Sequence, residues 1–232
     1  MTTNIELSEF DPEDLPQYSS IVACGSRKSG KGILTRDLVF KRYKDNVQTC
    51  FLFSPTAEFQ TSQMDFVPTY FKYKEFDPDV VERILSRQEF LIKNDPKGKY
   101  HTLLIVDDII ATMDAKAQKT LQKIFVCGRH YQVSIIVCFQ YVKREFDKIM
   151  RSNCDYVFCF NQKSYDNKES LVNDFLTISD NKKEGFYLMD KYATGFNCLV
   201  INNTHNTNEY ENFCFSYEAE IIKRKFKVGK DF

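Results

Sequence analysis

Hydrophobic positions fall into two alternating patterns along this chain. Continuous apolar runs predict buried strands, whereas apolar residues that recur every three or four positions predict amphipathic helices. We expect strands at residues 19–24, 49–53, 102–108, 133–138, 155–160 and 196–201, with an edge-like strand at 70–76. We expect helices after the first strand to about residue 43, from 78 onward, at 116–128, at 143–150 and again from 164. This alternation predicts an α/β fold with a parallel sheet covered on both faces, whose strand ends share one ligand-binding edge.

The length of 232 residues suits one well-packed domain with a short appendage. We divide the chain into an N-terminal arm at 1–18, a core at 19–205 and a C-terminal extension at 206–232. The arm is polar and acidic, and no apolar run reaches membrane-spanning length. We therefore expect neither a secretory signal nor a membrane partner.

Charge and cysteine content narrow the possible functions. The 32 basic and 32 acidic residues balance, so contact with nucleic acid would have to come from a local patch. The basic run at 223–227 is a candidate patch, although such runs are more often simply solvated. The eight cysteines include no Cys-x-x-Cys pair, and the three histidines show no metal spacing. This usage indicates buried, reduced thiols in a cytosol-like compartment.

A glycine-rich loop follows the first predicted strand and opens the first predicted helix. It consists of Gly25, Ser26, Arg27, Lys28, Ser29, Gly30, Lys31 and Gly32. A phosphate-binding loop has a glycine, four residues and then Gly-Lys-Ser/Thr, so that backbone N–H groups surround phosphate oxygens and the lysine reaches the terminal phosphates. Seven of the eight positions match, which predicts a nucleotide site. A plain solvated loop is the alternative, and for Lys28 alone it is the simpler interpretation.

Gly32 departs from this pattern, because it stands where a Ser or Thr hydroxyl would ligate Mg²⁺. Water can replace that ligand, yet Mg²⁺ requires near-ideal octahedral geometry and tolerates loose sites poorly. Thr35 lies one helical turn further on, too far along the helix to take over. We therefore expect ATP and Mg²⁺ to bind, with weak or slow hydrolysis as one outcome.

Two further strand ends carry the polar side chains that nucleoside triphosphate chemistry requires. Asp107 and Asp108 end one predicted strand, and Gln140 follows the next. In a parallel sheet these side chains and Lys31 would meet at one edge. We expect Asp107 to hold Mg²⁺ through its water shell and Asp108 to polarise the attacking water. The alternative is that the paired acids merely end a strand and cap the next turn.

The segment from Gly128 to Gln140 contains a Gly-Arg pair, a short turn, a buried strand and a glutamine at its end. This arrangement resembles the sensor region of the hexameric translocases of the FtsK and HerA superfamily. Residues 151–160 begin Arg-Ser-Asn and look like the Arg-x-Asn element before the next core strand of that superfamily. With the Asp-Asp pair and the short chain, the strongest likeness is to the A32-like genome-packaging ATPases of large DNA viruses, and it covers about residues 19–162.

That resemblance implies a RecA-like (ASCE-type) P-loop NTPase fold with a mainly parallel central sheet flanked by helices. The strand before Gln140 would lie between the loop strand and the Asp107 strand, and Gln140 would sense the γ-phosphate. The resemblance also implies a pentameric or hexameric ring with ATP at each interface and an arginine supplied by the neighbouring subunit. Arg129 is the first candidate and Arg151 the second.

Both arginines have local alternatives. Arg129 would be favourable near a helix C-terminus, and Arg151 would have a possible ion-pair partner in Asp147. The sequence does not separate sensing within the subunit from catalysis across an interface.

The function that the resemblance implies is an ATP-hydrolysing double-stranded DNA translocase that packages a viral genome into a capsid. Its partners would be DNA, further copies of the chain and a capsid or portal vertex, and it would work in the host cytoplasm at the site of virus assembly, or in the virion. A nucleotide-binding, hydrolysis-deficient switch or scaffold is the alternative that Gly32 raises. A small-molecule kinase would share the glycine loop, but residues 110–150 contain no arginine-rich lid cluster.

Overall fold

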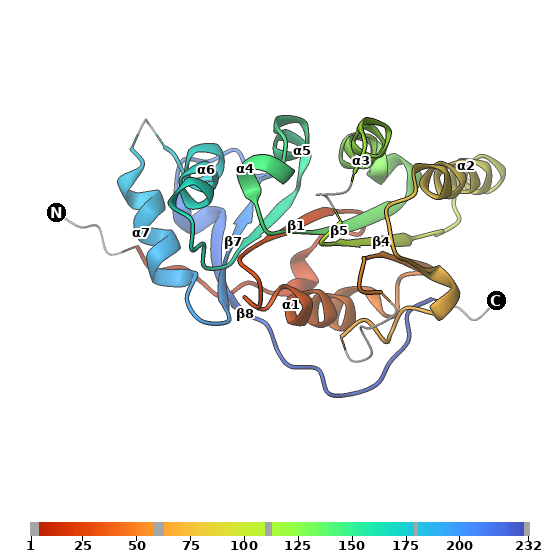
Figure 1. Cartoon of the computed structure of the whole chain (residues 1–232), viewed down its shortest axis with the longest axis horizontal. Coiled ribbons are helices and arrows are strands. Elements are labelled where there is room, and N and C mark those ends of the chain that lie inside the picture. Colours follow the sequence, from red (N-terminus) through yellow and green to blue (C-terminus); the bar gives the residue numbers. More distant parts are fainter. Residues whose placement is uncertain (1–4, 58–62, 110–112, 179–180, 230–232) are drawn as a thin grey trace.

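An eight-stranded sheet runs through the molecule in the order β3-β2-β4-β5-β1-β6-β7-β8, with helices on both faces (Figure 1). The computed structural model describes residues 5–57, 63–109, 113–178 and 181–229. The strands are β1 (Ser20–Cys24), β2 (Thr49–Phe53), β3 (Lys72–Tyr73), β4 (Thr102–Asp107), β5 (Val133–Phe139), β6 (Tyr156–Cys159), β7 (Asn197–Asn202) and β8 (Cys214–Glu218). The predicted α/β fold with a mainly parallel sheet is confirmed.

The helices cover the two faces unequally. They are α1 (Lys31–Leu38), which continues as a π-helical stretch (Val39–Tyr43), α2 (Pro78–Asn94), α3 (Ala115–Cys127), α4 (Val142–Glu145), α5 (Lys148–Asn153), α6 (Tyr165–Phe175) and α7 (Lys183–Tyr192). Short 3-10 turns lie at Pro12–Asp14, Thr69–Phe71, Gly128–Tyr131 and Tyr210–Asn212. Figure 1 shows α2, α3 and α5 on the face opposite α1. Alternate side chains of β1 reach both layers, since Val22 packs with the α2–α3 side and Ile21 with the α1 side.

The central strands are parallel, and their order is the one that the resemblance implied. β5 lies between β1 and β4, with Ile136 paired to Ile21 on one side and to Ile105 on the other. β6 continues the parallel arrangement on the other side of β1. β7 and β8 are antiparallel, so the sheet is mixed at this edge.

Aspartates fix the start of three helices. The side chains of Asp77, Asp114 and Asp147 each accept a hydrogen bond from backbone N–H groups in the first turn of α2, α3 and α5. In α2 the next residue is Pro78, whose missing N–H costs nothing at this position. These local signals explain why the helix positions follow from the sequence.

Two predicted elements differ from the observed ones, and one observed strand was not predicted. The single helix expected at 143–150 is two helices, because Phe146 leaves the helical path to pack its buried ring against Phe139 and Phe175, and Asp147 then caps a new helix. The strand expected at 70–76 is paired only at Lys72–Tyr73, although it does lie at the edge of the sheet. β8 was not predicted, and it lies inside the segment assigned to the C-terminal extension.

Both ends of the chain pack on the sheet. Phe10 is 4% exposed, and its ring contacts those of Tyr156, Phe158 and Tyr217. The segment after β8 runs past α1 on the same face of the sheet toward the start of β2, where the Val228 N–H donates to the Phe66 carbonyl at 3.1 Å. The division into arm, core and extension stays a prediction, but residues of all three parts are buried together.

The expectation of buried thiols agrees with the structure. All eight cysteines are free thiols, and only Cys127 among them is not buried. No helix in the described part of the chain is long and apolar enough to cross a membrane.

His101 is a buried base whose protonation opposes folding. Its side chain is 1% exposed, its Nε2 lies 2.8 Å from the Ser134 hydroxyl, and its Nδ1 has no hydrogen-bond partner among the described residues. Burial, with a smaller contribution from Arg42, lowers the pKa of His101 to about 4. A histidine in the unfolded chain takes up its proton near a pKa of about 6.5, so the unfolded state binds more protons between these two values.

We therefore predict that the free energy of unfolding falls as the pH is lowered from about 6.5 toward 4, with a loss from this group approaching about 3 kcal/mol. His101→Leu removes the titrating group and should flatten this part of the pH dependence, even if the variant is less stable at pH 7.5. Urea unfolding between pH 7.5 and 4.5 measures the slope. The exposed His130, changed to Gln, is the control and should keep the parental slope; equal slopes for the parent and His101→Leu would contradict the prediction.

Candidate functional site

The glycine loop lies between the end of β1 and the start of α1, as the pattern requires. Lys28 and Gly30 both have positive φ, 64° and 111°, so the loop turns through two left-handed residues before α1 begins. A Cβ atom on Gly25 would come within 2.7 Å of the Cβ of Phe160, so only glycine fits there without a shift. The Gly25 N–H donates to the Phe139 carbonyl at 3.1 Å, which anchors the start of the loop to β5.

The Lys31 ammonium group occupies the inside of the loop. It donates to the carbonyl oxygens of Gly25 at 2.6 Å and of Ser26 at 3.0 Å, and the residue is only 9% exposed. The nearby Ser29 hydroxyl is buried and has no partner among the described residues. Since buried hydroxyls normally have hydrogen-bond partners, this atom and the lysine are available to a ligand that enters the loop.

Polar side chains from β4 and β5 meet beside the loop. Asp108 has a φ of 58°, a left-handed conformation that aspartate tolerates, and its Oδ1 accepts a 2.6 Å hydrogen bond from the Gln140 amide. Asp107 pairs across the strands with Cys138, whose sulfur lies 3.6 Å from the Thr35 hydroxyl on α1. The edge thus brings together the ends of β4 and β5 and the first turns of α1.

The pKa of the Cys138 thiol depends on charged groups close to it. Burial raises the pKa of this thiol, Asp107 raises it further and Lys31 opposes the shift. The aspartate and the lysine are therefore close to the same buried sulfur, as expected for two groups that act on the same phosphates.

Glu145 holds the residue that follows β5, a role that we did not predict. Its Oε2 accepts hydrogen bonds from the backbone N–H groups of Gln140 and Tyr141, both at 3.0 Å, and the residue is 9% exposed. The Gln140 carbonyl accepts from Asn167 on α6 at 3.4 Å. A glutamate five residues after Gln140 was the available signal, but an acid in a short helix is too common to select by sequence alone.

Gly32 has a neighbour that the motif does not include. A Cβ atom on Gly32 would overlap the side-chain oxygen of Gln63, so an amide oxygen takes the space beside Gly32. The Gln63 carbonyl accepts from the Arg36 guanidinium at 3.2 Å, which keeps this segment against α1. Thr35 donates its hydroxyl to the Lys31 carbonyl at 3.0 Å, so it is committed to the helix backbone.

The donors at this edge suit a magnesium ion bound together with phosphates. Mg²⁺ takes oxygen ligands, usually one or two from the protein with the rest from phosphates and water. Asp107 supplies a carboxylate and Gln63 an amide oxygen at the start of α1. The described residues contain no group of three or more His, Cys, Asp or Glu side chains that could hold a metal without such help.

Arg129 lies at the opposite edge of the sheet from the glycine loop, whereas Arg151 contacts the segment that follows β5. Arg129 precedes β5 whereas Gln140 follows it, so about 20 Å of strand separates the two. Arg129 is exposed and lines a small depression with Ser20 and Asp155, at the amino ends of β1 and β6. Arg129 therefore cannot reach the glycine loop of its own subunit.

Arg151 is engaged within its own subunit. Its guanidinium donates to the Phe146 and Val142 carbonyls and forms a 2.5 Å ion pair with Asp174. The partner considered from the sequence, Asp147, instead accepts from Gln122 at 2.7 Å and caps α5. The Asp174 pair leaves Arg129 as the less constrained of the two arginines.

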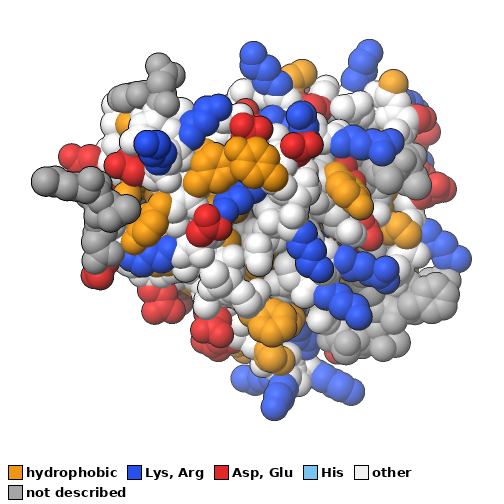
Figure 2. Space-filling model, turned by 60° about the vertical axis from the view of Figure 1, so that its left-hand side comes forward, with side chains coloured by type: hydrophobic (Ala, Val, Ile, Leu, Met, Phe, Trp, Pro, Cys, Tyr) orange, Lys and Arg blue, Asp and Glu red, His pale blue; other side chains and the backbone are white. Residues whose placement is uncertain are grey.

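On the face shown in Figure 2, basic and acidic side chains both occur, with hydrophobic side chains between them. The described residues on this face therefore form no single extended basic patch.

The strand, the glycine loop with its lysine, the helix behind it and the acids at the neighbouring strand end together define a P-loop NTPase of the RecA-like class. Residues 7–228 match the family described as Poxvirus A32 protein, and the chain belongs to that family. The match extends into both segments that we set apart from the core.

Two viral relatives are described as uncharacterized proteins. The chain is 27% identical over 237 residues to the uncharacterized protein L437 of Acanthamoeba polyphaga mimivirus, covering 97% of this chain and 80% of that protein. It is 25% identical to the uncharacterized protein 015R of Frog virus 3, covering 88% of this chain and 63% of the relative.

Solved structures share the fold at low identity. The genome packaging NTPase B204 of Sulfolobus turreted icosahedral virus 2, in complex with AMPPCP, superimposes with a TM-score of 0.59 at 15% identity, covering 89% of this chain and 100% of that one. The cytoplasmic domain of the Thermomonospora curvata type VII secretion ATPase EccC gives a TM-score of 0.60 at 12% identity, covering 88% of this chain and 25% of that one.

Proposed function

We propose that this chain is an ATP-hydrolysing double-stranded DNA translocase that packages a viral genome into a capsid. The observation that carries the proposal is the hydrogen bond between Gln140 and Asp108 at the same edge as the Lys31 loop. The family supports it, as do structural neighbours that bind ATP analogues and are described as packaging ATPases.

Each group has a step in hydrolysis. Lys31 leaves the loop carbonyls and pairs with the β- and γ-phosphates, which exchanges two neutral acceptors for charged ones. Asp108 takes the hydrogen bond of the attacking water, and Gln140 positions that water and responds to the γ-phosphate. Bound Mg²⁺, held on the Asp107 side, supplies charge neutralisation to the phosphates.

Assembly completes the site in this proposal. A pentameric or hexameric ring would bring the amino edge of one subunit, with Arg129, to the glycine loop of the next. Arg151 is the second candidate for this role, although its ion pair with Asp174 would have to open. The ring would act on DNA at a capsid or portal vertex in the host cytoplasm or in the virion.

We predict ATP hydrolysis that double-stranded DNA stimulates. Lys31→Ala and Asp108→Asn should each lower the rate about a hundredfold or more, because each removes a group that acts on charge in the transition state. Phosphate release, with and without DNA, and the oligomeric state under the same conditions are the measurements. Lys97→Ala and Asp45→Asn, exposed changes of the same kinds, serve as controls.

The alternative, a hydrolysis-deficient switch or scaffold, gives a different result in this experiment. Stoichiometric ATP binding without turnover in an assembled, DNA-bound state would favour it and contradict the translocase. Transfer of phosphate to a small-molecule acceptor, in place of release to water, would instead indicate a kinase.

We predict that Arg129 acts across the subunit interface. Arg129→Ala and Lys31→Ala should each be inactive alone, but a mixture should regain activity, because some interfaces then combine an intact loop with an intact arginine. Phosphate release from mixed rings at several ratios measures this. Arg151→Ala in place of Arg129→Ala tests the second candidate, and a mixture no more active than its components would overturn the trans assignment for Arg129.

A further inference from the structure

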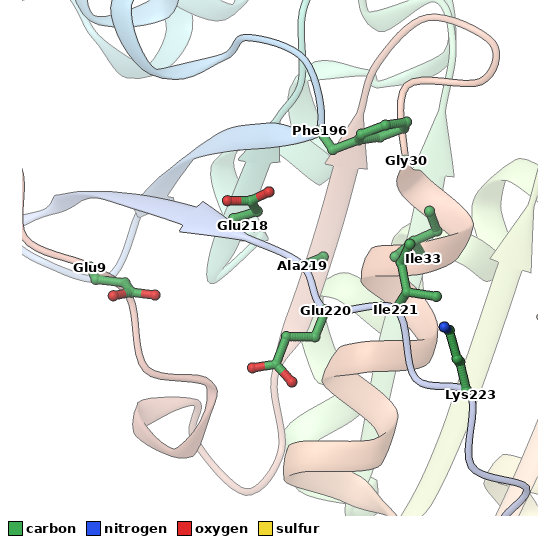
Figure 3. Close-up of a pocket in the computed structure, with 9 residues that line it drawn as sticks. All are labelled: Glu9, Gly30, Ile33, Phe196, Glu218, Ala219, Glu220, Ile221 and Lys223. Atoms are coloured by element: carbon green, nitrogen blue, oxygen red, sulfur yellow. The ribbon is translucent and has the colours of Figure 1, made fainter.

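A cavity of about 550 Å³ opens directly beside the glycine loop. It is lined by Glu9, Gly30, Ile33, Phe196, Glu218, Ala219, Glu220, Ile221 and Lys223. In Figure 3 the Phe196 ring lies next to Gly30 at the start of α1, and the chain after β8 forms the opposite wall. A volume of this size falls in the usual range for small-molecule sites.

Exposed apolar side chains form the walls of this cavity. Phe196 is 58% exposed and Ile221 is 70% exposed, so both leave apolar surface in water. Ile33 projects from α1 toward the same space (Figure 3). An open aromatic ring with aliphatic neighbours suits a flat, apolar ligand that can stack on it.

Two glycines place the Phe196 ring against the loop. Gly195 has a φ of 61°, which makes the turn just before Phe196. A Cβ atom on Gly30 would lie 3.3 Å from the Phe196 Cδ1, so the missing side chain lets the ring approach closely. The ring therefore begins where the phosphate-binding loop ends.

The cavity differs from the glycine loop in the charge of the residues that line it. Its wall contains Glu9, Glu218 and Glu220 against Lys223, which disfavours phosphate groups. Glu220 is paired with Lys41 at 3.0 Å, whereas Glu218 has no partner among the described residues. A carboxylate here can accept hydrogen bonds from the amino or ring N–H groups of a neutral purine.

The far wall of the cavity is held in place before any ligand binds. Arg36 on α1 donates to the carbonyls of Ile222 at 2.8 Å and of Arg224 at 2.9 Å. Its guanidinium is 4.9 Å from the centre of the Phe226 ring, which stacks on Phe66. A preformed wall lowers the ordering cost of binding.

We propose that this cavity holds the purine base of the nucleotide whose phosphates bind the glycine loop, with the base stacked on Phe196. This inference rests on the proposed nucleotide site and adds the part of the ligand that the motif does not address. Gly30 lines both regions, which provides the continuity that one ligand requires.

The test compares ATP with inorganic tripolyphosphate, which carries the phosphates without the base. Phe196→Ala should weaken ATP binding about tenfold or more, since base–aromatic stacking is lost, and should leave tripolyphosphate binding unchanged. Calorimetric titration of both ligands measures this, with GTP and UTP as comparisons. Phe90→Ala, which truncates a 66% exposed ring on α2, is the matched control and should change neither affinity.

The outcomes separate this inference from the proposed function. Parent protein that binds neither ATP nor tripolyphosphate would contradict the nucleotide site itself. Parent protein that binds tripolyphosphate as tightly as ATP, or an equal loss of both ligands in Phe196→Ala, would overturn the base cavity alone. Phe196→Leu keeps apolar volume without a ring, so it should show an intermediate loss if the truncated variant is too unstable to measure.

A second, independent observation concerns Gly32. The side-chain oxygen of Gln63 lies 2.0 Å from the position of a Cβ at residue 32, the atom that carries the hydroxyl in the usual motif. The Gln63 backbone carbonyl accepts from Arg36 at 3.2 Å, which holds this residue near the start of α1. We infer that the Gln63 amide oxygen takes the place of the missing hydroxyl toward a metal ion bound with nucleotide.

Metal affinity tests this substitution without reference to hydrolysis. Gln63→Ala should weaken Mn²⁺ binding to the complex with AMPPCP at least about tenfold, a loss of the size that follows removal of even an outer contact in metal sites. Adding Gly32→Ser to Gln63→Ala should restore it, because the hydroxyl then has room. Electron paramagnetic resonance of free and bound Mn²⁺ is the measurement, and Gln17→Ala, an exposed glutamine at a distance, is the control.

Equal Mn²⁺ affinity in Gln63→Ala and Gln17→Ala, or a double variant that stays weak, would contradict the role of Gln63. Absence of AMPPCP binding in the parent protein, with or without Mn²⁺, would instead count against the proposed nucleotide site.

Discussion

The parallel pairing of β5 between β4 and β1 is the constraint on which the site depends. Because Ile136 pairs with Ile105 and Ile21, the three strands end together at one edge of the sheet. A slip by one residue would exchange the side chains that β5 presents to the two helical layers, so close packing on both faces opposes it. The glycine loop and the polar ends of β4 and β5 meet for this reason.

Buried charge on α1 extends this organisation to distant parts of the chain. Arg36 is 5% exposed, forms an ion pair with Asp65 and donates to carbonyls in the segment before β3 and in the segment after β8. Asp37 is fully buried and accepts from the Tyr217 hydroxyl, while Lys41 lies 3.2 Å away. Removing one partner of a buried ion pair is strongly destabilising, so these contacts couple the loop helix to β8 and to the segment that follows it.

Local patterns were enough for most of the fold and for part of the candidate site. Strands such as β2 and β5 are continuous apolar runs, and helices such as α2 begin at a capping aspartate, so short windows contain the signal. Asp108 and Gln140 follow buried strands, and parallel pairing alone brings them together. β8 was not predicted because Cys214–Glu218 has no distinctive hydrophobic pattern. It forms a strand through its antiparallel pairing with β7.

The sequence by itself determined the class of fold, the glycine loop and the residues at the neighbouring strand ends. Each of these follows from the hydrophobic periodicity of a short segment or from a motif of fixed spacing. Only the tertiary structure decided that Gln63 lies beside Gly32, that Glu145 holds Gln140 and that Phe196 faces the loop. It also decided that Arg129 lies at the opposite edge from Lys31. These contacts depend on how segments distant in the sequence pack together. The spacing of residues along the chain does not determine which distant side chain fills the space beside a glycine.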